Sequence, residues 1–262
     1  MSRKTIVSLT VLAAAVFSSA NVAAASVPSA LTPAQQQQME KVVHDYLVNH
    51  PEVLVEASQV LQKKQQQEMQ NQAQAAIVNQ ASDLFKPNMT MAGNLKGDVT
   101  LVEFFDYQCG HCKKMQPVVS TLIEKNKNLR VIYKEFPIFG KSSEFASQAV
   151  LAAARQGKYV QLQEALFKFD KPLNDEAVLG AAKNVGLNID QLKKDMASSA
   201  VKEELEQNRA LAEKIHLMGT PAFIVAYTPM GQFDSKVAPA FLPGGASEAA
   251  MQEMIDQIKP KK

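Results

Sequence analysis

Hydrophobic residues are arranged along the chain in patterns that predict buried strands and a helix. An apolar run over 99–105, "VTLVEFF", predicts a buried strand, and the following "CKKMQPVVSTLIEKNK" carries its apolar residues at helical spacing. Two more strands are expected, one within "VIYKEFP" and one at "AFIVAY", residues 222–227. Cys109 therefore lies where a strand is followed directly by the N-terminus of a helix.

Helical patterns fill the region between the second and third of these strands. Five segments after "VIYKEFPIFG" have apolar residues at helical spacing and Gly, Asn or Pro at their boundaries. They span 143–156, 158–169, 175–185, 189–197 and 201–217. His216, close to the end of the last segment, is interpreted as a structural residue.

The N-terminal region has a different pattern, with two short apolar stripes and then a polar stretch. The first stripe runs from Met39 to Leu47 and the second from Val53 to Leu61, with a break at "NHPEV" that places Pro51 at a helix start. Two short helices alone cannot bury both stripes. The next residues, "QKKQQQEMQNQAQ", fit a solvent-spanning helix or a disordered linker. We interpret the region as a dimerisation segment with a helical stalk, and the alternative is a simple spacer.

The first residues predict export from the cytoplasm. Arg3 and Lys4 precede an apolar stretch over about 6–17, which is shorter than the roughly 20 residues of a membrane span, and small residues suit cleavage near Ala25. The chain has 28 Lys and Arg against 26 Asp and Glu, so loss of these two bases leaves a formally neutral mature protein. Neutrality argues against nucleic acid as the main partner, because binding to phosphates needs clustered positive charge.

Both cysteines of the chain occur in one motif, "CGHC", as Cys109 and Cys112. A structural disulfide between them would close a loop that contributes roughly 2 kcal/mol at most, and a zinc site would need two further ligands from scattered histidines. A redox-active pair is the interpretation we favour over both. The unpaired N–H groups and dipole of the helix N-terminus, with His111 when protonated, favour the thiolate form of Cys109. Cys112, one turn inside the helix, suits a shielded resolving thiol.

These residues carry a resemblance to a known family. The strand, the Cys-X-X-Cys motif at a helix start and the later "MGTPAFIVAY" resemble the thioredoxin superfamily, and "VEFFDYQCGHCKKMQPV" resembles the DsbA-type periplasmic thiol:disulfide oxidoreductases over about residues 85–258. The resemblance implies an α/β, thioredoxin-like fold with an inserted helical domain at about 140–217. The expected organisation is a signal peptide over 1–25, a helical dimerisation region and stalk over 26–84, and a catalytic domain over 85–262.

Further site residues follow from the resemblance. Glu103, an acid in an apolar strand, is expected to exchange a proton with the resolving thiol, because burial raises the pKa of a carboxyl. Lys134, in the neighbouring strand, is a candidate partner for Glu103, and an outward-facing pair or a plain salt bridge is the alternative. Thr220 and Pro221 are expected to form a cis peptide beside the cysteines and, with Gly110, to contact substrate.

The resemblance implies an exported enzyme that forms or isomerises disulfide bonds through Cys109 as attacking thiolate. It requires no metal and no organic cofactor. The expected partners are unfolded or misoxidised exported proteins, a membrane redox partner and a second copy of the chain, in the periplasm. Gly110 and His111 match the eukaryotic disulfide isomerases, and Thr220 matches the dimeric periplasmic isomerases. The helical insertion is expected to help shape an apolar groove for polypeptide. A non-enzymatic dimeric holdase and a dedicated periplasmic reductase remain the alternatives.

Overall fold

The computed structural model describes residues 31–170 and 172–258, which fall into two compact units that divide between Val60 and Leu61. The predicted signal peptide over 1–25 lies outside the described residues. Each unit has its own structure, and both cysteines lie in the second.

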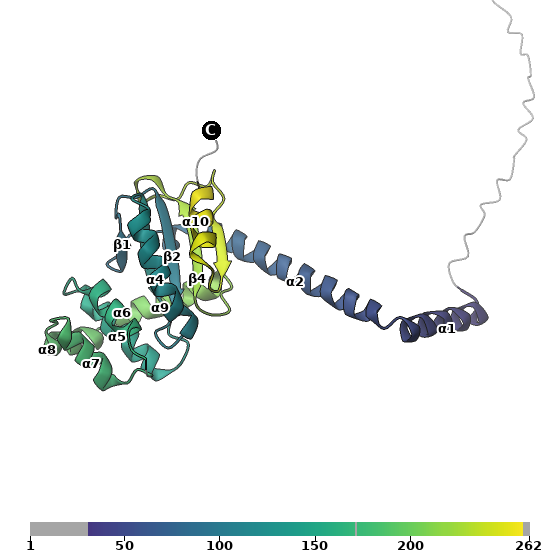
Figure 1. Ribbon diagram of the computed structural model, residues 1–262, viewed down its shortest axis with the longest axis horizontal. Coiled ribbons are helices and arrows are strands. Elements are labelled where there is room, and N and C mark those ends of the chain that lie inside the picture. Colours follow the sequence, from purple (N-terminus) through teal and green to yellow (C-terminus); the bar gives the residue numbers. More distant parts are fainter. Residues whose placement is uncertain (1–30, 171, 259–262) are drawn as a thin grey trace, which may run out of the picture. The chain divides into compact units, whose positions relative to one another are not determined.

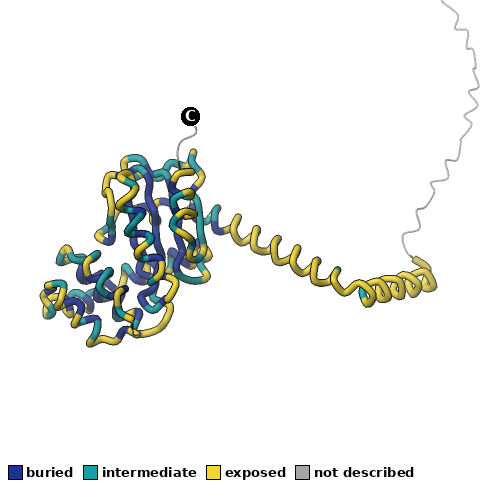
Figure 2. Tube along the Cα trace, in the orientation of Figure 1, coloured by how far each residue is buried: buried dark blue, intermediate teal, exposed yellow. Residues whose placement is uncertain are grey.

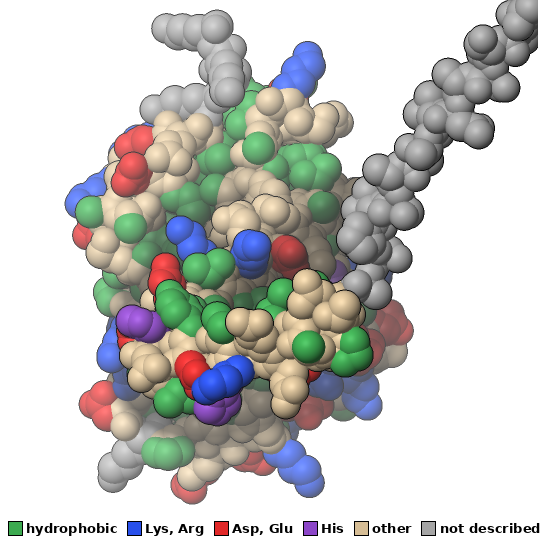
Figure 3. Space-filling model, turned by 90° about the vertical axis from the view of Figure 1, so that its right-hand side faces the viewer, with side chains coloured by type: hydrophobic (Ala, Val, Ile, Leu, Met, Phe, Trp, Pro, Cys, Tyr) green, Lys and Arg blue, Asp and Glu red, His purple; other side chains and the backbone are tan. Residues whose placement is uncertain are grey.

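The N-terminal apolar stripes lie on helices and are exposed. α1 (Pro33–Asn49) begins with a capping box in which Thr32 and Gln35 satisfy each other's backbone N–H groups, and it has no buried residue. Four side chains of the first stripe each keep at least half of their surface exposed, namely Met39, Val42, Val43 and Tyr46. Hydrophobic side chains are visible at the molecular surface among polar and charged ones (Figure 3). Burial of these stripes therefore requires another surface.

α2 (Glu52–Asn79) is one continuous helix of 28 residues. Its polar stretch is helical, so the expectation of a solvent-exposed helix is confirmed and the disordered linker is not. Most of the helix is exposed, but Ala73 and Ile77 near its C-terminal end are buried (Figure 2). Ile77 and Leu84 of α3 (Ala81–Leu84) are fully buried in the core of the second unit. This packing explains why the units divide earlier than the predicted boundary at 84/85.

A five-stranded mixed sheet forms the centre of the second unit (Figure 1). Its order is β1-β3-β2-β4-β5. The strands are β1 (Met91–Gly93), β2 (Val99–Phe105), β3 (Leu129–Glu135), β4 (Ala222–Tyr227) and β5 (Ala240–Pro243). β2 and β3 are parallel, and the other neighbouring pairs are antiparallel. Every residue of β2 and β3 is buried, as the continuous apolar run predicts for central strands.

Successive residues of the central strands face opposite sides of the sheet. Leu101 and Phe105 of β2 belong to the core shared with α4 (Gly110–Lys125) and α10 (Glu248–Gln257), as well as with the helical insertion. Val102 and Phe104 belong to a second core with α3 and the C-terminal turns of α2 and of α9 (Ser199–Lys214). The sheet thus has a layer of helices on each face.

All five predicted helices of the insertion are present. They are α5 (Lys141–Ala154), α6 (Tyr159–Phe167), α7 (Asp175–Asn184), α8 (Ile189–Met196) and α9 (Ser199–Lys214). The side chains of Asn174, Asn188 and Ser198 cap the starts of α7, α8 and α9 by accepting backbone hydrogen bonds. Figure 1 shows α5, α6, α7 and α8 gathered beside the sheet. The remaining short element is the 3₁₀ turn η1 (Pro229–Gly231).

Candidate functional site

The two cysteines lie at the start of α4, where the sequence places them. Cys109 is the N-cap residue and is only 5% exposed, Gly110 and His111 are exposed in the first turn, and Cys112 is fully buried. Both thiols are free in this structure. Because the first N–H groups of a helix lack intrahelical partners, negative charge on the Cys109 sulfur is stabilised there.

Cys109 also contacts the peptide that precedes β4. The bond between Thr220 and Pro221 is cis, as expected, and the Cys109 thiol donates a hydrogen bond to the Thr220 carbonyl oxygen at 3.3 Å. The register Phe104↔Ala222 between β2 and β4 brings this peptide to the end of β2, where the cysteine loop begins. The Thr220 hydroxyl is buried beside the Cys112 sulfur, where it favours the charged form of that thiol. The structure therefore brings Cys109, Thr220 and Pro221 together.

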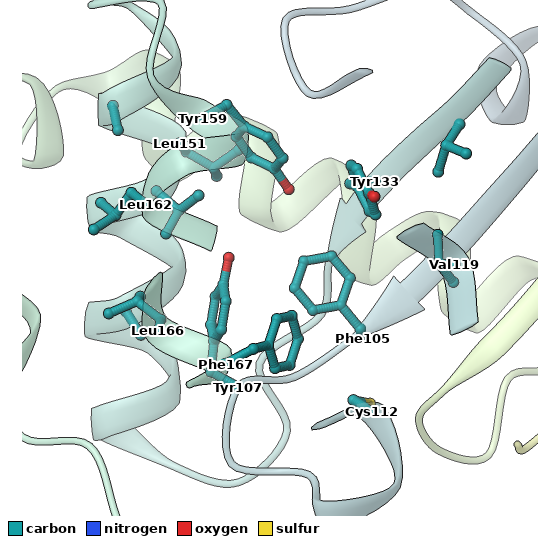
Figure 4. Close-up of a cluster of buried hydrophobic side chains, with 14 of the residues drawn as sticks. Phe105, Tyr107, Cys112, Val119, Tyr133, Leu151, Tyr159, Leu162, Leu166 and Phe167 are labelled. Carbon is teal, nitrogen blue, oxygen red and sulfur yellow. The ribbon is translucent and has the colours of Figure 1, made fainter. Parts of the chain in front are cut away.

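Cys112 differs from Cys109 in its surroundings. It packs inside the core near Phe105 and Val119 (Figure 4), and burial raises the pKa of its thiol well above the ordinary value. A buried thiol with a raised pKa does not form a free thiolate readily at neutral pH. Accordingly, Cys112 suits attack on the Cys109 sulfur once that sulfur is joined to a substrate, and it does not suit attack on an external disulfide.

Glu103 lies on the same sheet face as the cysteine pair. Its strand neighbours Tyr133 and Phe223 belong to the core that contains Cys112. The Glu103 carboxyl is 3% exposed, and burial, followed by the nearby Glu135 carboxyl, raises its pKa from 4.5 to about 8. Its side chain has no hydrogen-bond partner within the described part of the chain. The carboxyl is thus protonated at neutral pH and able to give up that proton.

The predicted pairing of Lys134 with Glu103 is wrong. In the parallel register, Lys134 is opposite Phe104, so its side chain is on the other face of the sheet from Glu103. Its ammonium group donates a long hydrogen bond of 3.5 Å to the Asp83 carbonyl, and burial lowers its pKa. Lys134 lines a separate pocket with Glu204 on the α9 side. It has no contact with the reacting sulfurs.

A second buried carboxyl, Glu135, was not found from the sequence. It accepts hydrogen bonds of 2.8 Å from the hydroxyls of Tyr107, Tyr159 and Ser147. Figure 4 shows both tyrosine rings inside the core between the sheet and the insertion. Burial raises the pKa of Glu135 to about 8, although the three hydroxyls act in the opposite direction. An acid inside an apolar strand is the signal that identified Glu103, and it applies equally to Glu135.

Asp106 holds the loop that carries Cys109. Its buried carboxylate accepts hydrogen bonds from the backbone of Gln108, from the backbone of Ile138 and Phe139, and from the hydroxyl of Ser143. The loop between β2 and α4 is therefore fixed to the segment that enters the helical insertion. This residue was also missed, although an acid directly after a buried strand and before the cysteine motif was visible in the sequence.

Comparison with known families accounts for most of the chain. The DSBA-like thioredoxin domain matches residues 100–256, a segment that contains both cysteines and the cis peptide. The chain belongs to the DsbA-like thioredoxin family. The thioredoxin-like fold with its inserted helices is thereby confirmed. Residues 35–68 match a second model, the N-terminal domain of the copper resistance protein ScsC.

Solved structures agree with this assignment. BcfH of Salmonella enterica Typhimurium is 32% identical, with coverage of 86% of this chain and 96% of that chain and a TM-score of 0.72. A thioredoxin-like oxidoreductase from Silicibacter pomeroyi DSS-3 is 37% identical over 67% of this chain and 95% of its own, with a TM-score of 0.61. Both similarities extend across nearly the whole of the known structure.

The curated relatives that match this chain include proteins of different kinds. The thiol:disulfide interchange protein DsbA of Bordetella parapertussis is 28% identical over 143 residues, which are 53% of this chain and 68% of that protein. A Na⁺/H⁺ antiporter NhaA 3 of Salinispora tropica is 25% identical over 135 residues, or 51% of this chain but only 21% of the antiporter's length. Among the described helices, none is both long enough and apolar enough to span a bilayer.

Proposed function

We propose that the protein is an exported thiol:disulfide oxidoreductase that forms or isomerises disulfide bonds in secreted proteins through Cys109 and Cys112. The observation that supports this most directly is the contrast between the two thiols. Cys109 lies at a helix N-terminus and against the cis peptide, whereas Cys112 is fully buried with a raised pKa. This contrast supports attack by Cys109 and resolution by Cys112.

In oxidation, a substrate thiolate attacks the Sγ of Cys109 in the Cys109–Cys112 disulfide. The bond between the substrate sulfur and Cys109 forms while the disulfide breaks, and Cys112 leaves as a thiolate. A second substrate thiolate then attacks the substrate sulfur of the mixed disulfide. Cys109 leaves, the substrate gains a disulfide, and its two electrons remain on the cysteine pair. A membrane redox partner has to remove these electrons to complete the cycle.

In isomerisation, the reduced pair starts the reaction. The Cys109 thiolate attacks a wrong substrate disulfide, and one substrate sulfur leaves as a thiolate. That thiolate, or another in the substrate, attacks the mixed disulfide and regenerates Cys109 with a new pairing. Cys112 attacks Cys109 only when the substrate fails to rearrange, which releases a reduced substrate.

Glu103 is proposed to exchange the proton of the resolving thiol, through water. When Cys112 leaves as a thiolate in the buried core, its raised pKa makes it a strong base that needs a proton. The protonated Glu103 carboxyl on the same face supplies it, and the charged carboxylate takes it back in the reverse step. Glu103→Gln should therefore slow release of the mixed disulfide and leave the first attack by Cys109 nearly unchanged.

The cellular setting follows from the same proposal. The expected partners are unfolded or misoxidised exported proteins, and the predicted location is the periplasm. The relatives support this setting, since one structural neighbour is described as a periplasmic thioredoxin-like protein from Salmonella enterica serovar Typhimurium. His111, exposed beside Cys109, and Gly110 are expected to border the bound substrate.

Self-association is proposed to occur through the exposed stripes of α1 and the start of α2, giving a homodimer. Val43→Lys combined with Tyr46→Lys places charge in the first stripe, and light scattering of the full chain should then report a monomer. The matched control is Gln37→Lys with Gln38→Lys on the same helix, which should leave the mass unchanged. A dimer that persists in the Val43 and Tyr46 variant would refute this interface.

Two assays test the main proposal with the full chain. The first is refolding of a scrambled multi-disulfide substrate, in which Cys109→Ser should abolish activity and Cys112→Ser should trap the mixed disulfide. A chain that protects unfolded protein equally well after Cys109→Ser would be a holdase. The second assay is a titration of the cysteine pair against glutathione. A potential far more reducing than that of the glutathione pool would identify a dedicated reductase.

A further inference from the structure

A groove with no acidic, Lys or Arg side chain in its lining lies beside the cis peptide, and α2 forms one of its walls. Its volume is about 510 Å³. Met69 and Ala73 of α2 line one side, and Met218, Pro221 and Phe241 line the rest. Met69 is 56% exposed and Met218 is 93% exposed, so both side chains are free to contact another molecule. The groove lies wholly within the unit of residues 61–262.

The helical wall is held in place by packing and by a hydrogen bond. Ala73 and Ile77 are buried within the second unit, and the Gln74 side-chain amide donates to the Pro239 carbonyl just before β5. The segment that provides this wall, from Met69 onward, lies between the residues matched by the two family models. This wall is therefore part of the unit of residues 61–262, although the same helix, α2, also carries the second apolar stripe at its N-terminal end.

One residue of the groove lining also contacts the reacting sulfur. Thr220 lines the groove, and its carbonyl oxygen accepts a hydrogen bond of 3.3 Å from the Cys109 Sγ. A polypeptide that forms a mixed disulfide with Cys109 is thus covalently held beside Thr220, next to the groove. This attachment identifies the occupant as the substrate segment next to the reacting cysteine.

We propose that this groove binds an apolar side chain of an unfolded polypeptide, near the cysteine that is joined to Cys109, and that Met69 and Met218 determine this preference. The inference rests on the proposed function and adds the substrate's chemical class. Methionine side chains are flexible and polarisable, so they adapt to apolar groups of different shape. The glutamines of α2 at the rim, Gln66 and Gln70, offer donors and acceptors to an extended backbone.

The test uses full-length protein with Cys112→Ser, so that the reaction stops at the mixed disulfide. The probes are short peptides with one cysteine joined to 5-thio-2-nitrobenzoate and with a single leucine or serine at successive positions. The Cys109 thiolate attacks the peptide sulfur, the new disulfide forms, and the coloured thiolate leaves, so no other oxidant is needed. Each rate is divided by the rate of the same variant with the symmetrical nitrobenzoate disulfide.

The peptide with leucine at one position near the cysteine should react about tenfold faster than the peptide with serine there. A tenfold ratio corresponds to burial of part of the leucine side chain. Met69→Ser and Met218→Ser should each reduce this ratio to about twofold or less. Met230→Ser is the matched control, because Met230 is 92% exposed and does not line the groove, and its ratio should equal that of the unchanged chain.

Three results would overturn the proposal while leaving the oxidoreductase function intact. The first is a tenfold leucine preference that persists in both groove variants. The second is the absence of any leucine preference in the unchanged groove. A lower mass of the Met69→Ser chain in light scattering would also overturn it, because a second copy would then be the occupant. No reaction of Cys109 with either kind of disulfide would instead contradict the proposed function itself.

Discussion

Replacement of the buried Glu103 carboxyl by an amide should increase stability, and the increase should grow with pH. In the native state the pKa of Glu103 is raised from 4.5 to about 8, because burial disfavours its charged form. Between these two pKa values the native state binds the proton more tightly than the unfolded chain does. Stability therefore falls as pH rises from 4.5 to about 8, and it is fully retained only below 4.5.

The size of this effect follows from proton linkage. Each pH unit between the two pKa values costs about 1.4 kcal/mol, so the proton that Glu103 must take up on folding costs about 3 kcal/mol of stability at about pH 7. Glu103→Gln removes the titration and keeps a similar shape. Any fixed cost of burying the amide is the same at every pH, so the dependence of the difference on pH isolates the carboxyl.

Urea denaturation with both cysteines kept reduced measures this difference at about pH 5, 6, 7 and 8. We expect the free energy of unfolding of the Glu103→Gln chain, relative to that of the unchanged chain, to rise by about 1 kcal/mol or more for each pH unit. This rise should level off above about pH 8. Glu124→Gln, at an exposed position of α4, is the control and should show no such trend. A difference that stays constant from about pH 5 to 8 would refute the reasoning.

Three further outcomes are expected from the buried groups of the site. Tyr159→Phe removes a hydroxyl from Glu135, so it should cost about 2 kcal/mol above pH 8, where that carboxyl is charged, and less at about pH 5; equal losses in urea denaturation would contradict this. Thr220→Val removes a buried hydroxyl that favours the charged form of Cys112, so Cys112 should be alkylated more slowly than in the unchanged chain, and an equal rate would contradict this contact. In single Cys→Ser variants, Cys109 should be alkylated faster than Cys112 at neutral pH, and the reverse order would exchange their roles.

Local signals were sufficient to predict the elements around the cysteines. The apolar run of β2, the helical spacing of α4 and the Thr220–Pro221 dipeptide before an apolar strand are each contained in a few consecutive residues. The insertion helices could be predicted for the same reason, since their boundaries carry Asn, Gly and Ser.

Relations between distant segments could not be predicted in this way. The position of Lys134 within β3 was correct, but the face on which its side chain lies depends on the strand register. A change of one residue in register moves every side chain to the opposite face. The hydroxyl groups around Glu135 come from a loop and two helices of the insertion, so no local pattern relates them.

The anchors of the insertion determine how freely it can be exchanged between related proteins. Asp106 and Glu135, at the ends of the two central strands, accept hydrogen bonds from residues of the insertion and of the segment leading into it. A chimera that receives a foreign helical block without equivalents of Ser143, Ser147 and Tyr159 removes one donor from Asp106 and two of the three hydroxyl donors from Glu135. A change at Asp106 or Glu135 therefore requires a matching change in the insertion residues that donate to it. The insertion and the cysteine loop can be exchanged between related proteins only together.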